Sequence, residues 1–203
     1  NACILHYSAN ARQMQEGELL LVDAGCEFDC YASDVTRTYP VGGRFSPAQR
    51  AIYDIVLEAH GAALKAVRPG NHWNDPHDAA VRVISRGLRR LGLLKGSVAA
   101  IIRARQYREF FMHRTGHWLG MDVHDVGDYK VGDQWRLLEP GMTLTIEPGI
   151  YIAPGSRGVG RRWQGIGVRI EDDVLVTREG AEVLTGGLPR KAEEIEALVG
   201  VGS

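Results

Sequence analysis

The sequence predicts one α+β domain, in which a helical middle section lies between two sections of short strands. The chain of 203 residues is long enough for a single large domain with a substantial core, and 44% of it is hydrophobic. Its 25 glycines favour many strands and tight turns. Apolar residues recur at helical spacing only in the middle of the chain, between the two sections of short apolar runs.

The first section contains short apolar runs that end at turn residues. Residues 1–7 already have a strand-like composition, and residues 18–24 form a continuous apolar run that predicts a buried strand ending at Gly25. Residues 26–39 predict two or three antiparallel strands, which Pro40 and the Gly42-Gly43 pair close.

The middle section begins with a clear helix start. Ser46 is a good N-cap, Pro47 suits the first helical position, and Gln49 can complete a capping box. The periodic apolar positions then predict a helix up to about residue 67. A second helix is expected over 75–92 and a shorter third one over 97–105.

The last section returns to short strands. A basic glycine-rich segment at 155–165 lacks the spacing of a phosphate-binding loop and is expected to be a solvated surface loop. A short terminal helix begins at Glu193. The predicted strands are 142–148, 150–152, 167–171, 174–177 and 182–184.

Composition excludes several classes of protein. With 24 Lys and Arg against 25 Asp and Glu, the net charge is −1, which removes the electrostatic case for a nucleic-acid partner. No apolar run approaches the roughly 20 residues of a membrane-spanning helix. The three cysteines, Cys3, Cys26 and Cys30, are too few for a disulfide framework. They are expected to be packed free thiols in a reducing cytoplasm.

Five polar residues lie in largely apolar surroundings. Each has a structural explanation alone: a turn cap, an arginine partner or a core histidine. Together they are harder to explain, because unpaired buried carboxylates cost several kcal/mol each. Two divalent ions would balance the four carboxylates, and oxygen-rich ligands with one imidazole favour Mn²⁺ over Zn²⁺. The five residues are Asp23, Asp34, His117, Glu147 and Glu171.

Six segments, taken in order, carry a family resemblance: 20–26, 33–38, 117–120, 139–142, 147–149 and 167–172. They resemble the motifs of aminopeptidase P, the bacterial Xaa-Pro aminopeptidases among the pita-bread metallopeptidases. The resemblance extends from residue 4 to about 198. It implies a creatinase/aminopeptidase-like pita-bread fold, with a mixed or antiparallel curved sheet and helices on its outer face. It also implies that residues 1–203 form a catalytic metallopeptidase domain, whose first part and N-terminal neighbour lie outside this chain.

The resemblance further implies roles for individual residues. Asp23 would chelate one metal ion, Asp34 and Glu171 would bridge both ions, and His117 and Glu147 would complete the second. The implied catalytic residues are Glu147 as the proton shuttle, His124 or His113 as the group that polarises the carbonyl, and also His6 and Arg169. The implied substrate-binding residues are His6, His113, His124, Tyr151 and Arg169. Strand alternation would place Arg169 and Glu171 on one face, so that Arg169 orients the bridging carboxylate.

The implied reaction is hydrolysis of an N-terminal Xaa-Pro bond by two divalent ions, Mn²⁺ by preference, with a bridging water or hydroxide as the nucleophile. Peptides with proline at the second position would be the substrates, and the full-length protein would be a homo-oligomer. A prolidase shares the fold and ligands and remains an alternative, as does an impaired pita-bread fragment that acts as a binding module. A methionine aminopeptidase matches less well, and a glycosidase would leave two acids and the histidine unexplained.

Overall fold

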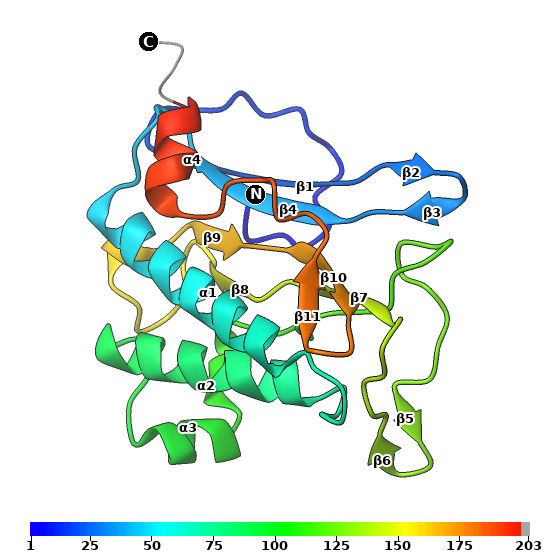
Figure 1. The fold of residues 1–203 in the computed structure, drawn as a ribbon. Coiled ribbons are helices and arrows are strands. Elements are labelled where there is room, and N and C mark those ends of the chain that lie inside the picture. Colours follow the sequence, from blue (N-terminus) through cyan, green and yellow to red (C-terminus); the bar gives the residue numbers. More distant parts are fainter. Residues whose placement is uncertain (200–203) are drawn as a thin grey trace.

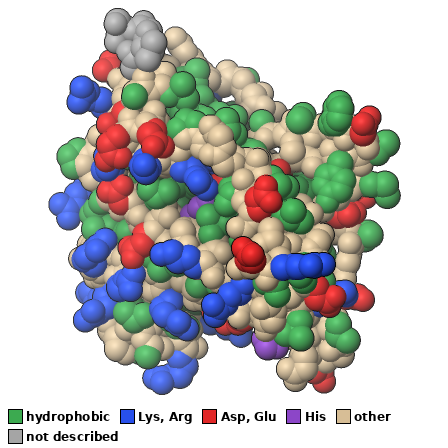
Figure 2. Space-filling model, in the orientation of Figure 1, with side chains coloured by type: hydrophobic (Ala, Val, Ile, Leu, Met, Phe, Trp, Pro, Cys, Tyr) green, Lys and Arg blue, Asp and Glu red, His purple; other side chains and the backbone are tan. Residues whose placement is uncertain are grey.

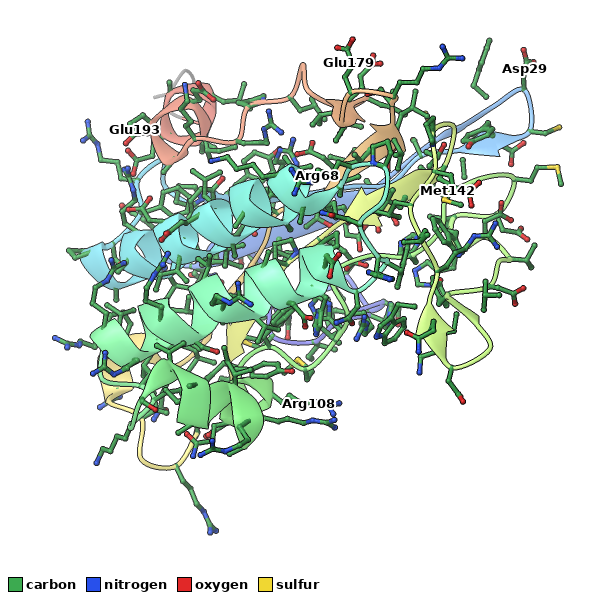
Figure 3. The ribbon with its side chains drawn as sticks, turned by 60° about the horizontal axis from the view of Figure 1, so that its bottom comes forward. Asp29, Arg68, Arg108, Met142, Glu179 and Glu193 are labelled. Atoms are coloured by element: carbon green, nitrogen blue, oxygen red, sulfur yellow. The ribbon has the colours of Figure 1, made fainter. Side chains whose placement is uncertain are left out.

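The computed structural model describes residues 1–199, and its N-terminal section is built around a long β-hairpin (Figure 1). Strand β1 (Leu19–Ala24) pairs antiparallel with β4 (Val35–Pro40), in a register that sets Asp23 opposite Thr36. Two short strands, β2 (Glu27–Phe28) and β3 (Tyr31–Ala32), extend the hairpin into a ribbon. The ribbon projects from the body of the molecule, and Asp29 lies at its tip (Figure 3).

The predicted helices are present. Helix α1 (Pro47–Ala66) starts with the expected capping box, in which Ser46 and Gln49 each accept a hydrogen bond from the other's backbone N–H. Helix α2 (Asp75–Arg90) packs on α1 so closely that a Cβ on Gly87 would lie 2.7 Å from the Ile55 side chain. Two short helical segments follow, α3 (Val98–Arg103) and the 3₁₀ turn η1 (Gln106–Glu109).

The C-terminal section supplies the remaining strands. Strand β10 lies between β11 and β7, and β8 pairs with β9, all of them antiparallel. The elements are β5 (Lys130–Val131), β6 (Gln134–Trp135), β7 (Thr143–Ile146), β8 (Gly149–Ile152), the 3₁₀ turn η2 (Arg161–Trp163), β9 (Ile166–Arg169), β10 (Asp172–Val176), β11 (Ala181–Val183) and α4 (Ala192–Val199).

The helices cover one face of the strands, as the expected architecture requires. Helices α1 and α2 lie side by side in front of the strands (Figure 3), and α1 contacts β7, β8 and β9. His60 of α1 lies 3.0 Å from the carboxylate of Asp172. Glu171, the residue just before Asp172, instead lines a cavity together with Asp23. Since neighbouring residues point to opposite faces in extended chain, the cavity and the helices lie on opposite sides of the sheet.

Several expectations about local structure are wrong. Residues 1–7 form turns and bends instead of a strand, and β1 is half-buried to exposed, with Val22 38% exposed. Within residues 1–199, β1 pairs with β4 alone, which leaves its other edge unpaired. The strand expected over 167–171 ends at Arg169. The backbone N–H of Glu171 donates to the carbonyl of Thr36 on β4 instead of continuing the pairing with β8.

The surface also differs from expectation in detail. The three cysteines are free as expected, but Cys26, in the link between β1 and β2, and Cys30, in the β2–β3 turn, are exposed and not packed. The β5–β6 hairpin was not anticipated, and the expected loop at 155–165 contains η2 with a buried Trp163. Hydrophobic side chains gather over the β2–β3 ribbon, and Lys and Arg over the helices (Figure 2). Within residues 1–199, no helix combines the length and the apolar character that crossing a bilayer requires.

Candidate metal centre

A cavity of about 430 Å³ lies on the face of the sheet opposite the helices. Every site residue predicted from the sequence lines it except Tyr151, which is buried behind the wall with 2% exposure. The wall consists of Leu5, His6, Asp23, Asp34, Trp73, His113, Arg114, Gly116, His117, His124, Tyr129, Trp135, Glu147, Arg169 and Glu171.

The five predicted metal ligands come from five separate places in the chain and converge in the cavity. Asp23 lies near the end of β1, and Asp34 immediately precedes β4. Glu147 occupies the bend between β7 and β8, and Glu171 the bend between β9 and β10. His117 lies on a segment that hydrogen bonds to β7, through Thr145 N–H to the His117 carbonyl at 3.0 Å.

The ligand atoms form overlapping groups, each with its atoms within 4.8 Å of one another. One group is Asp23, Asp34 and Glu171, and a second is His117, Glu147 and Glu171. Glu171 belongs to both, so the two groups share this carboxylate. A third group, Asp34, His117 and His124, links the same two positions.

His117 is oriented for coordination. Its Nδ1 donates to the carbonyl of Trp118 at 2.9 Å, which leaves Nε2 facing the cavity. Nε2 lies 3.4 Å from Asp34 Oδ2 and 3.9 Å from Glu147 Oε1. The exposed ring of His124 lies over His117, with ring centroids 3.8 Å apart.

The electrostatics of the cavity favour added positive charge. Burial raises the pKa of Glu147 to about 7, and burial together with the charges of Glu147 and Asp34 raises the pKa of Glu171. Burial and Asp34 also raise the pKa of Asp23, although its side chain is 40% exposed. Arg169 offsets only part of this negative charge. Oxygen-rich ligands with one imidazole suit hard divalent cations, so the residues fit such ions.

Arg169 occupies the floor of the site but does not act as the sequence suggested. Its Nη2 donates to Asp23 Oδ2 at 2.5 Å and its Nη1 to the Tyr151 hydroxyl at 3.0 Å. Its Nε donates to Thr36 Oγ1 at 3.2 Å, and Thr36 in turn donates to Glu171 Oε2 at 2.5 Å. The expected direct orientation of Glu171 by Arg169 is therefore wrong, because Thr36 lies between them.

Tyr151 supports the neighbouring histidine from behind the wall. Its hydroxyl lies 2.9 Å from His113 Nε2, while His113 Nδ1 lies 2.6 Å from the Arg114 carbonyl. Burial lowers the pKa of His113 to about 4, so the ring is neutral at pH 7. Nδ1 then donates to the carbonyl, and Nε2 accepts from the tyrosine.

Several residues of the cavity wall were not predicted from the sequence. Trp73, Tyr129 and Trp135 add an aromatic side to the cavity, with Trp73 and Tyr129 ring centroids 4.7 Å apart. The Arg114 guanidinium lies over Trp135 at 4.9 Å. No local pattern in the sequence marks these wall residues. Thr36, which lies behind the wall, could have been found, because it follows Asp34 by two positions and strand alternation places Thr36 and Asp34 on the same face.

Comparison with known proteins places these features in a family. Metallopeptidase family M24 matches residues 1–178. Curated relatives named Xaa-Pro aminopeptidase include one from Escherichia coli, 52% identical, and one from Haemophilus influenzae, 50% identical. Each alignment covers 98% of this chain but 45% and 46% of the relative, so the chain spans about half the length of the curated relatives it matches.

Solved structures agree. An aminopeptidase from Pseudomonas aeruginosa is 62% identical with a TM-score of 0.97, over 98% of this chain and 45% of that one. Proline aminopeptidase P II from Yersinia pestis is 50% identical with a TM-score of 0.96, over 100% of this chain and 46% of that one. The chain therefore has the pita-bread fold of these enzymes.

Proposed function

Because the chain belongs to metallopeptidase family M24, we propose that residues 1–203 form the catalytic metallopeptidase domain of an aminopeptidase that cleaves N-terminal Xaa-Pro bonds. One observation carries the proposal: two groups of ligand atoms share Glu171 inside one cavity. The names of the relatives support the preference for proline.

The proposed cofactor is a pair of divalent ions, Mn²⁺ by preference. Asp23, Asp34 and Glu171 would hold one ion, and His117, Glu147 and Glu171 would hold the other, with Asp34 as a second shared ligand. When bound, such ions would lower the pKa of a water molecule held in the site, which could then act as the bridging nucleophile, and would stabilise negative charge on the reacting carbonyl.

The chain's own residues would supply the proton transfer and orient the substrate. Glu147 lies in the cavity wall, where it would take a proton from the nucleophile and pass it to the departing amine. The exposed His124 would hydrogen bond to the scissile carbonyl. Both ring nitrogens of His113 are already hydrogen bonded, to the Arg114 carbonyl and the Tyr151 hydroxyl, so His113 would form part of the wall that contacts the substrate. His6, at the cavity wall, would contact the substrate, and Arg169 and Tyr151 would hold the floor of the site.

An assay with matched peptides tests the proposed activity. The chain, loaded with Mn²⁺, is offered an Ala-Pro-Ala amide, an Ala-Ala-Ala amide and the dipeptide Ala-Pro. We expect the chain to release the first residue of the Ala-Pro-Ala amide but not that of the Ala-Ala-Ala amide. The Glu147→Gln variant should lose this activity. Cleavage of the dipeptide only would support a prolidase. Mn²⁺ binding without any cleavage would support a binding module.

The other expectations rest on the sequence. The homo-oligomer and the cytoplasmic location are proposed for the whole protein, of which this chain covers one part. The net charge of −1 supports the absence of a nucleic-acid partner. Light scattering of the full-length protein tests the oligomer.

A further inference from the structure

Thr36 lies at the junction of the hydrogen bonds that connect two of the candidate ligands. Its side chain is fully buried, and its register position on β4 is opposite Asp23 on β1. From Asp23 the connection passes to Arg169 Nη2, from Arg169 Nε to Thr36 Oγ1, and from Thr36 Oγ1 to Glu171 Oε2. One hydroxyl therefore joins the supports of both carboxylates.

The chemistry of the partners fixes the direction of these hydrogen bonds. An arginine guanidinium only donates, so Thr36 Oγ1 must accept from Arg169 Nε at 3.2 Å. Glu171 must be ionised to bind a cation, and an ionised carboxylate only accepts, so in that form the hydroxyl proton points to Glu171 Oε2 at 2.5 Å. The carboxylate thus receives one charge-assisted hydrogen bond from a group that has no freedom to turn away.

Thr36 also holds the backbone of Glu171. Its carbonyl accepts the Glu171 N–H at 3.0 Å, in the bend between β9 and β10 where no regular ladder fixes that residue. Backbone and side chain of one threonine therefore restrain both the position and the rotation of the Glu171 carboxylate, which is 2% exposed.

We propose that Thr36 is a positioning residue for the metal centre, whose hydroxyl orients the Glu171 carboxylate so that its remaining lone pairs face the two cation positions. The inference rests on the proposed function, since it assigns Glu171 as the shared ligand. Outer partners of this kind change metal affinity about 10- to 100-fold when removed.

The chain supplies a matched control two residues further along the same strand. Thr38 is also fully buried, but its hydroxyl donates to the Arg169 carbonyl at 3.0 Å and accepts the Arg169 N–H at 3.2 Å. It contacts no candidate ligand through its side chain among the described residues. Thr38→Val therefore removes the same atoms from the same face of β4 without touching Glu171.

The test is Mn²⁺ titration by calorimetry, with electron paramagnetic resonance to detect the coupled ion pair, on Thr36→Val, Thr36→Ser and Thr38→Val. Circular dichroism confirms that each variant is folded. We expect a 10- to 100-fold weaker Mn²⁺ affinity and a weaker pair signal in Thr36→Val. Thr36→Ser, which retains the hydroxyl, and Thr38→Val should stay within about threefold of the wild-type affinity.

Three results would overturn the inference while leaving the proposed function intact: wild-type affinity in Thr36→Val, a serine variant as weak as the valine variant, or an equal loss in Thr38→Val. A wild-type chain that binds no Mn²⁺ would instead remove the proposed function, and the inference with it. Should Thr36→Val fail to fold, Thr36→Ala takes its place under the same criteria.

Discussion

The guanidinium of Arg37 and the carboxylate of Asp172 form an ion pair of 2.8 Å behind the metal-binding face, with side-chain exposures of 3% and 0%. Arg37 also donates to the carbonyls of Glu171 at 2.6 Å and Pro189 at 2.8 Å. Asp172 accepts from Thr185 at 2.6 Å as well. The pair thus joins β4, the bend that carries Glu171 and the C-terminal segment.

We expect Asp172→Asn to destabilise the chain by about 3–5 kcal/mol. Removing one partner leaves the buried charge of Arg37 uncompensated, which costs far more than the net gain of an intact pair. Urea unfolding followed by circular dichroism measures the change. The control is Glu58→Gln, which breaks an exposed pair with Arg86 and should cost about 0–1 kcal/mol. Equal midpoints for the two variants would contradict this.

Two glycine substitutions should act in opposite directions. A Cβ on Gly116 would lie 2.0 Å from the Thr145 carbonyl oxygen, so Gly116→Ala must push the segment carrying His117 away from β7. Gly61 lies within α1 with no atom within 4 Å of such a Cβ. We expect Gly116→Ala to lower stability by about 1–3 kcal/mol and to weaken Mn²⁺ binding. Gly61→Ala should raise stability by about 0.5–1 kcal/mol.

Thermal unfolding and Mn²⁺ titration of the two glycine variants measure both effects. A Gly116→Ala chain with unchanged metal affinity would show that the close contact between residue 116 and β7 does not position His117.

The pH dependence of stability should change sign when metal is added. Burial raises the pKa of Glu147 from 4.5 to about 7, so the metal-free folded chain binds this proton more tightly than the unfolded chain does. The stabilisation is complete below pH 4.5 and is lost as the pH rises towards about 7. Bound cations require the ionised carboxylates, so Mn²⁺ should stabilise more as the pH rises.

Unfolding temperatures in chelator and in excess Mn²⁺, measured from about pH 5 to pH 8, test this prediction. Glu147→Gln serves as the control, because it removes one of the titrating carboxyl groups and should make the metal-free curve less steep. Parallel curves with and without Mn²⁺ would contradict a metal site built on these carboxylates.

Local signals were sufficient to predict the helices. The Ser46, Pro47 and Gln49 pattern marks the start of α1 because a helix cap is made by residues three apart. The β5–β6 hairpin was missed because each strand has only two residues, and Gly132, with φ of 60°, was the one visible turn signal. The residues at which strands end could not be predicted, because they depend on hydrogen bonds to distant parts of the chain. The bond from the Glu171 N–H to the Thr36 carbonyl, beyond the end of β9, is one example.

The candidate site was predictable to the extent that motifs marked it. The resemblance identified the predicted ligand, catalytic and substrate-binding residues, and all of them line the cavity except Tyr151. The charge argument alone would have given the carboxylates and His117. Thr36 was missed because an uncharged hydroxyl in a strand gives no such signal, and its role depends on two partners more than 130 residues away.

Anomalous diffraction at the manganese edge, from a crystal of the chain soaked in Mn²⁺, would locate the bound cations. We expect two peaks in the cavity, one bounded by Asp23, Asp34 and Glu171 and the other by His117, Glu147 and Glu171. A single peak, peaks elsewhere, or a cavity in which Asp23, Asp34 and Glu171 point away from one another would contradict it.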